Sequence, residues 1–193
     1  MLVVLEGVDG LGKSAIISAV RKAFPLNNVV ICSDPCKEHP ATLAIRQYIF
    51  ARGDTLPVES QVKLFEAARL ILWHDIIEPA LQANELVICD RIWLSNWVYQ
   101  DTKVEAFPKV DLLFYLHDGT DNDLHRKYTF SISQAIYEKA ILEAELINAL
   151  DIEKAAYQIF TSICDQKAGL RRYNSPPRRH TSILSNLFIS SRE

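Results

Sequence analysis

The segment MLVVLEGVDGLGKS at the start of the chain constrains its fold more than any other part of the sequence. The apolar run Leu2–Leu5 leads directly into a glycine-rich segment that ends in Lys13 and Ser14. A buried strand followed by a glycine-rich turn and a helix is the setting of the pattern G-x-x-x-x-G-K-[ST]. Gly7, Gly12, Lys13 and Ser14 complete that pattern, and Gly10 lies between the two outer glycines.

Each residue type in this pattern has a chemical purpose. Glycines let backbone amides approach phosphate oxygens, and the first turn of the following helix adds the positive end of its dipole. Lys13 is placed to reach the β- and γ-phosphates, and the Ser14 hydroxyl suits Mg²⁺. The sequence therefore predicts a nucleoside triphosphate site formed by Gly7, Gly10, Gly12, Lys13, Ser14 and Ala15.

Short apolar runs recur along the chain and alternate with helical patterns. The runs are nearly continuous rather than alternating, as in strands buried on both faces of a parallel sheet. This alternation predicts an α/β fold in which helices flank a five-stranded parallel sheet on both faces. The expected strands are Leu2–Leu5, Val29–Cys32, Leu86–Cys89, Leu112–Leu116 and Leu146–Leu150, and the expected helices are Lys13–Phe24, Thr42–Ala51, Val58–Asn84 with a kink at Pro79, Leu94–Gln100, Ser133–Glu145 and Ile152–Lys167.

Composition narrows the class of protein. A net charge of −3 over 193 residues excludes a uniformly basic nucleic-acid coat protein. No apolar run reaches the length of a membrane span, the start of the chain does not resemble a signal peptide, and the four cysteines have no paired spacing. We therefore expect a cytoplasmic protein with reduced thiols, made of one domain over residues 1–167 and a basic tail over 168–193. We expect that tail to be solvated, with nucleic-acid binding as the alternative.

Three further groups of residues give the chain a family resemblance. An acid, Asp9, lies inside the glycine-rich loop, and Phe65 and Arg69 stand four residues apart on a predicted helix. The third group follows the Leu86–Cys89 run as Asp90-Arg91, Ser95-Asn96 and Tyr99. With the loop, and with VDLLFYL at positions 110–116, these groups resemble the thymidylate kinases, which phosphorylate dTMP with ATP. The resemblance implies a P-loop fold with a lid, ATP and Mg²⁺ as cofactors, and a homodimer.

The resemblance also implies a role for each matching residue. Asp9 would accept a hydrogen bond from the deoxyribose 3′-hydroxyl, Phe65 would stack on thymine, and Arg69 would donate to its O4 atom. Arg91 would hold the acceptor phosphate and the transferring phosphoryl group, while Asp90 would orient Arg91 or the Mg²⁺ water shell. Asn96 and Tyr99 would read the base edge and exclude a ribose 2′-hydroxyl.

The chain departs from the family pattern at three places. Lys37 stands where the family usually has an arginine against the acceptor phosphate, and a lysine lacks the bidentate fork. Gly10 stands at the loop position where a family member can carry an extra arginine, so the lid has to supply that cation. The candidates are Arg126 and Lys127, within an expected lid at 118–132. Trp93 and Trp97 stand where the family usually has smaller residues, so they are candidates to fill the acceptor pocket. These departures would suit a divergent enzyme, such as a viral one, with an altered choice of nucleotide.

Two other functions remain open from the sequence. One is a kinase of a deoxynucleoside or of a modified pyrimidine nucleotide, including one within DNA, although nucleoside kinases usually have a glutamate where the strand here ends Cys89-Asp90-Arg91. The other is a nucleotide-binding scaffold without phosphotransfer, which the intact Lys13 and Ser14 disfavour.

Overall fold

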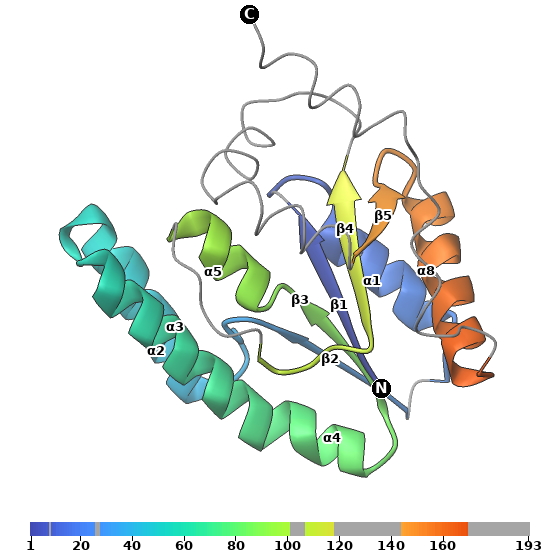
Figure 1. Ribbon diagram of the computed structural model, residues 1–193, viewed down its shortest axis with the longest axis horizontal. Coiled ribbons are helices and arrows are strands. Elements are labelled where there is room, and N and C mark those ends of the chain that lie inside the picture. Colours follow the sequence, from blue (N-terminus) through green and yellow to red (C-terminus); the bar gives the residue numbers. More distant parts are fainter. Residues whose placement is uncertain (8, 26–27, 101–106, 118–143, 170–193) are drawn as a thin grey trace, which may run out of the picture.

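The structure is a computed structural model that describes residues 1–7, 9–25, 28–100, 107–117 and 144–169, with backbone alone at 54, 97–99 and 146. Its centre is a five-stranded sheet in the order β2-β3-β1-β4-β5, and every pair of neighbours is parallel (Figure 1). The predicted fold class is confirmed. The strands are β1 (Leu2–Gly7), β2 (Val29–Ser33), β3 (Leu86–Asp90), β4 (Leu112–His117) and β5 (Glu145–Asn148).

Helices cover both faces of this sheet. On one face α1 (Lys13–Lys22) and α8 (Ile152–Lys167) pack together over a core that includes Val3, Leu5 and Phe114. The other face carries α3 (Val58–Leu72), α4 (Glu78–Gln82) and α5 (Trp93–Tyr99). Alternate β1 side chains enter the two cores, which explains why the run reads as continuously apolar.

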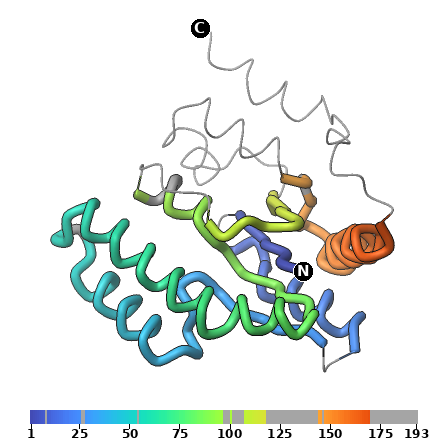
Figure 2. The backbone as a smooth tube through the Cα atoms, turned by 60° about the horizontal axis from the view of Figure 1, so that its bottom comes forward, coloured from blue at the N-terminus to red at the C-terminus, as the bar shows by residue number. Residues whose placement is uncertain are grey.

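One further helix, α2 (Pro40–Arg52), packs beside α3, and the pair extends beyond the strands (Figures 1 and 2). A 3₁₀ turn, Gly53–Thr55, joins them. Gly53 has a positive φ of 49°, a conformation that glycine adopts without steric cost.

The long helix expected over Val58–Asn84 forms, but its irregularity differs from the expected kink. Between α3 and α4 the chain makes a π-helical turn, Trp73–Ile77, in which the Glu78 N–H bonds to the Trp73 carbonyl. Pro79 has no N–H, so the Asp75 carbonyl loses its usual donor four residues later. The wider turn before the proline accommodates this loss, and the helix axis continues into α4.

The end of the described chain corrects two further expectations. Glu145 begins β5 instead of ending a helix, and the strand stops at Asn148. The Asn148 Oδ1 atom accepts a hydrogen bond from the Leu150 N–H at 2.9 Å, which turns the chain out of the sheet. Asp151 then caps α8, and its Oδ1 atom accepts from the Lys154 N–H at 3.0 Å. The expected lid, most of the Ser133–Glu145 helix and residues 170–193 of the tail lie outside the described residues.

The strand order places a crevice where a ligand is expected. From β1 the chain passes β3 to reach β2, and from β3 it passes β1 to reach β4. Neighbouring strands whose connections leave in opposite directions form a topological switch point, and ligands bind there outside the carboxyl ends of the strands. Gly7 and Asp90, the last residues of β1 and β3, therefore lie at the same edge.

Two further features concern the cysteines and the helices. All four cysteines carry free thiols, and the described residues contain no cluster of three or more His, Cys, Asp or Glu side chains able to hold a metal ion. Within the same residues, no helix combines the length and the apolar character that crossing a membrane requires.

Candidate active site

The glycine-rich loop joins β1 to α1 at the switch point. Gly7, Gly10 and Gly12 have positive φ values of 145°, 89° and 73°. A Cβ atom added to Gly7 would lie 2.7 Å from the Leu116 carbonyl oxygen of β4, so only glycine fits there. Ser14 and Ala15 follow in the first turn of α1, where backbone amides have no partner within the helix. The nucleotide-binding residues predicted between Gly7 and Ala15 therefore lie in the one segment that joins β1 to α1.

Lys13 is folded back over its own loop. Its side chain is buried, its Nζ atom donates to the Gly7 carbonyl at 3.1 Å and lies 3.8 Å from Asp9 Oδ1. Burial, followed by repulsion from Arg91, lowers the pKa of Lys13. An anion bound in the loop would offset both effects.

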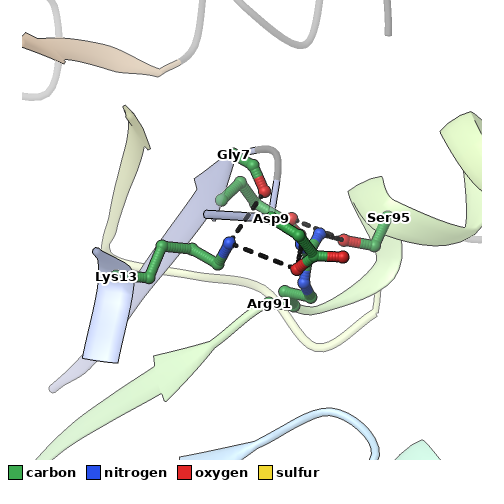
Figure 3. A network of polar contacts seen from close by, with 6 residues as sticks. Gly7, Asp9, Lys13, Arg91 and Ser95 are labelled. Atoms are coloured by element: carbon green, nitrogen blue, oxygen red, sulfur yellow. Dashed lines mark hydrogen bonds and ion pairs between the residues drawn. The ribbon is translucent and has the colours of Figure 1, made fainter. Parts of the chain in front are cut away.

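Asp9 connects the loop to the neighbouring strand (Figure 3). Its Oδ1 atom accepts from Arg91 Nη2 at 2.7 Å, although the Asp9 side chain is 81% exposed. Partial desolvation opposes ionisation, but the charge and hydrogen bond of Arg91, with Lys13, outweigh it and lower the pKa of Asp9. A carboxylate has two acceptor oxygens, so pairing through Oδ1 leaves Oδ2 able to accept from a ligand hydroxyl.

Arg91 is held by contacts along its whole length. Its backbone has a positive φ of 71°, which is uncommon outside glycine, and its N–H bonds to the Leu5 carbonyl at 2.9 Å. Its Nη1 atom donates to Ser95 Oγ at 2.9 Å, and the Ser95 hydroxyl donates to Glu6 Oε2 at 2.7 Å. The structure thus places Arg91 between Asp9 and Ser95, facing the loop (Figure 3).

Asp90 and Ser14 supply the oxygen atoms that a magnesium ion prefers. Asp90 Oδ1 is buried and has no hydrogen-bond partner in the described part of the chain. Burial raises the pKa of Asp90, and the nearby charges of Lys13, Arg91 and Lys37 oppose that shift. A buried carboxylate oxygen without a donor, at the end of a strand beside the phosphate loop, fits a cation-binding role.

A second network of polar side chains, around Arg69, lies next to the network around Arg91. Arg69 on α3 is 3% exposed, its Nε atom donates to Asp34 Oδ2 at 2.7 Å, and its Nη2 atom donates to Asn96 Oδ1 at 2.9 Å. Burial raises the pKa of Asp34 despite the opposing charge of Arg69. Asp34 Oδ1 and Asn96 Nδ2 are buried without partners among the described residues, which is unusual unless a polar ligand completes them.

The two networks are connected through the backbone and through α5. Ser95 and Asn96 are consecutive on that helix, one bonded to Arg91 and the other to Arg69. The Asp34 N–H also donates to the Asp90 carbonyl at 3.1 Å. The structure therefore brings Asp9, Arg69, Asp90, Arg91 and Asn96 into one site.

Besides Ser95, which belongs to the family motif without an assigned role, three residues of this site have no role predicted from the sequence. Glu6 is an acid within an apolar strand, and that interruption is the signal that could have found it. Asp34 is an acid directly before a proline at the end of β2. Arg46 on α2 is a third, since its charge is among those that lower the pKa of Asp9.

The other predicted site residues differ in burial and in whether the structure describes them. Phe65 is partly buried and lies one turn before Arg69 on α3, while Lys37 is exposed after β2. Trp93 is 5% exposed and belongs to the same buried cluster as Leu94, and its place in the acceptor pocket stays a prediction. Arg126 and Lys127, and the side chains of Trp97 and Tyr99, lie outside the described residues.

The strand order and the loop place the chain in the P-loop class of nucleotide-binding proteins. A family model, "Thymidylate kinase", matches residues 5–140. The thymidylate kinase of Mycoplasmoides gallisepticum is 32% identical over 155 residues, which cover 78% of this chain and 72% of that protein. The thymidylate kinase of Mycoplasma genitalium is 35% identical over 103 residues, or 52% of this chain and about half (48%) of that protein.

A solved structure agrees with these matches. The thymidylate kinase of Ehrlichia chaffeensis superposes with a TM-score of 0.67 at 22% identity, covering 85% of this chain and 98% of the other, and this likeness shows a shared fold. The chain belongs to the thymidylate kinase family. The predicted family and the predicted enzyme class, a nucleoside monophosphate kinase, are thereby confirmed.

The raised pKa of Asp90 gives a test of the site's electrostatics. A carboxylate whose folded-state pKa exceeds its unfolded value contributes stability at low pH that is lost as the pH rises through the folded pKa. Asp90→Asn removes this loss, so we expect a higher free energy of unfolding at pH 7 and a smaller gain near pH 5.

Urea denaturation of the ligand-free protein across this pH range measures the effect. The matched control is Asp165→Asn on α8, away from the site. If Asp90→Asn is less stable than the parent at pH 7, the raised pKa of Asp90 is contradicted.

Proposed function

We propose that this chain transfers the γ-phosphoryl group of ATP to the 5′-phosphate of dTMP, giving dTDP and ADP, in the cytoplasm. Membership of the thymidylate kinase family supports this activity. The observation that carries the proposal is the contact between Asp9 in the loop and Arg91 after β3, which joins a phosphate-binding turn to a second cationic group across the crevice. The four free cysteines suit the reducing environment of the cytoplasm.

The donor side of the reaction is assigned to the loop. Lys13 and the amides of Gly10, Gly12, Ser14 and Ala15 would bind the β- and γ-phosphates of ATP. The lowered pKa of Lys13 supports this role, because triphosphate oxygens would supply the negative charge that its buried position lacks. Arg126 and Lys127 remain the predicted lid cations.

The acceptor side is assigned to the residues that surround Arg91 and Arg69. Arg91 would hold the phosphate of dTMP, with Lys37 and Arg46 as further cations, and Asp9 would accept from the 3′-hydroxyl. Arg69 and Asn96 would meet the polar edge of thymine, and Phe65 would stack on its ring. The buried, unpartnered atoms of Asp34 and Asn96 support a polar ligand at this position. Tyr99 remains the predicted guard against a ribose 2′-hydroxyl.

Magnesium fits the oxygen donors of the site. Ser14 and Asp90 would hold the ion or its water shell, and the ion would neutralise charge on the phosphate oxygens. The hard oxygen donors and the unpartnered Asp90 Oδ1 atom are the observations behind this assignment.

The chemistry requires placement and charge more than proton transfer. An oxygen of the acceptor phosphate attacks the γ-phosphorus, and the bond from that phosphorus to the β–γ bridging oxygen breaks. The acceptor oxygen is already anionic, so no residue has to remove a proton. Lys13 and Arg91 approach this reaction centre from neighbouring strands and stabilise the charge that moves between the phosphates.

Loss of either central cation is expected to abolish the activity. Lys13→Ala and Arg91→Ala should lower kcat by about 10²–10³-fold or more, because each removes a preorganised charge from the transition state. The measurement is a coupled assay of ADP formation with ATP, dTMP and Mg²⁺. Lys22→Ala, at the exposed end of α1, is the matched control and should behave as the parent. Normal turnover by either test variant would refute the roles assigned to these two cations.

The acceptor is identified by a substrate screen. We expect dTMP to give the highest kcat/KM among dTMP, dUMP, dCMP, dGMP, thymidine and an oligonucleotide with a modified pyrimidine. A site with buried hydrogen-bonding groups rejects acceptors that leave them unpaired. Faster turnover of thymidine or of the oligonucleotide would favour the alternative kinases, and ATP binding without transfer to any acceptor would favour the scaffold.

We also propose that the enzyme is a homodimer that associates through α2 and α3. Four of the exposed large apolar side chains lie on these two helices or at their ends: Tyr48, Phe50, Val58 and Leu70, between 48% and 63% exposed. Apolar side chains gathered on one pair of helices suit an interface better than a solvated surface.

Sedimentation of the full chain tests the dimer. We expect a particle of twice 21.9 kDa, and Phe50→Glu should shift it towards the monomer because a charge would be buried at the contact. Tyr157→Glu, on the opposite layer at α8, is the control and should leave the dimer intact. A monomeric parent at micromolar concentration would contradict the proposal.

A further inference from the structure

Glu6 is a fully buried acid in the central strand of the sheet. It is 0% exposed, and its neighbours along β1, Leu5 and Gly7, are also buried. Burial raises the pKa of Glu6, while Arg91 and the hydrogen bonds from Ser95 and Ile92 oppose that shift. A carboxyl group placed in such surroundings is costly unless its hydrogen bonds are satisfied, so its contacts indicate what it does.

Both oxygens of Glu6 contact the segment that carries Arg91. Oε1 accepts from the Ile92 N–H at 2.8 Å, and Oε2 accepts from the Ser95 hydroxyl at 2.7 Å. Arg91 directly precedes Ile92 in the sequence, and its backbone is in the left-handed region. Glu6 therefore fixes the start of the segment that follows an arginine whose backbone conformation is unfavourable on its own.

The Ser95 hydroxyl transmits this contact to the arginine side chain. A hydroxyl group can donate one hydrogen bond and accept another at the same time. Ser95 is bonded to Glu6 through its proton and accepts from Arg91 Nη1 at 2.9 Å. Arg91 Nη2 then reaches Asp9 Oδ1 at 2.7 Å (Figure 3). A continuous chain of contacts therefore runs from the buried strand to the exposed loop.

From this geometry we propose that Glu6 is a positioning residue for the phosphotransfer, acting through Ser95 to set the direction of the Arg91 guanidinium. Glu6 itself touches no substrate. The inference rests on the function proposed for Arg91. It explains why β1, which otherwise contributes only apolar side chains and the loop glycine, carries an acid.

The test compares variants that break the contact with variants that keep it. Glu6→Leu suits an apolar core but offers no hydrogen bond, and Ser95→Ala removes the hydroxyl. Each should lower kcat by on the order of 10²-fold, since a small misplacement of a catalytic group has that effect. The KM for ATP should stay within about twofold, because neither substitution removes a group assigned to ATP binding. Ser95→Thr keeps the hydroxyl and should recover most of the kcat. Glu6→Gln keeps an acceptor for the Ile92 N–H and reverses the second bond, since its NH2 group can donate to the Ser95 oxygen, so it should recover part of the kcat.

The controls separate positioning from stability. Ser162→Ala on α8 removes another buried hydroxyl, bonded to Glu145, and should lower the melting temperature without changing kcat. The double variant Glu6→Leu/Ser95→Ala should be no slower than the slower single variant, since both act through one contact. If Glu6→Leu does not fold, the comparison of Ser95→Ala with Ser95→Thr decides the outcome.

The possible failures are distinguishable. Normal kcat in Glu6→Leu and Ser95→Ala, with a loss in Arg91→Ala, would overturn the positioning role and leave the proposed function intact. An equal loss in Ser95→Thr and Ser95→Ala would also overturn it, because the hydroxyl would then be irrelevant. Normal turnover in Arg91→Ala would remove the proposed function together with this inference.

Discussion

The parallel pairing of β1 with β3 is the constraint on which the site depends. The register sets Leu5 opposite Asp90, and the Arg91 N–H closes onto the Leu5 carbonyl. The phosphate loop and the Asp90-Arg91 segment therefore emerge side by side, although 82 positions separate Asp9 from Arg91. The two apolar cores on the faces of the sheet hold this register, because a shift by one residue would exchange the side chains of the two faces.

The site concentrates charges that are expensive to bury and keeps them in mutual contact. Arg69 faces Asp34, Arg91 faces Asp9, and Lys13 lies near Asp9. Burial still moves the pKa values of Lys13, Asp34 and Asp90 towards their neutral forms. Burying these charged groups lowers the stability of the protein but keeps them in place for a ligand. A bound nucleotide and cation would offset the free-energy cost of burying them.

Helix α5 couples the two halves of the region that we propose for the acceptor. Ser95 and Asn96 are neighbours on its first turns and bond to Arg91 and Arg69, respectively. The residues assigned to the phosphate and to the base are therefore fixed by one rigid element, whose start is in turn fixed by Glu6 through the Ile92 N–H. Placement of this kind suits a reaction whose rate depends on the alignment of two phosphate groups.

The sequence by itself determined the strands, most helices and the loop. Each of these is encoded locally, by apolar runs such as Leu86–Cys89, by the cap Asp151 and by the spacing of Gly7, Gly12 and Lys13. The family resemblance carried the prediction further, to Asp9, Arg69 and Arg91, which the structure brings into one site.

Only the tertiary structure decided which of these residues touch. The contacts Glu6–Ser95 and Arg69–Asp34 join residues 89 and 35 positions apart, so no local pattern encodes them. Side-chain partners across a sheet depend on strand order and register, and these are fixed by the burial of both faces together, not by any one segment.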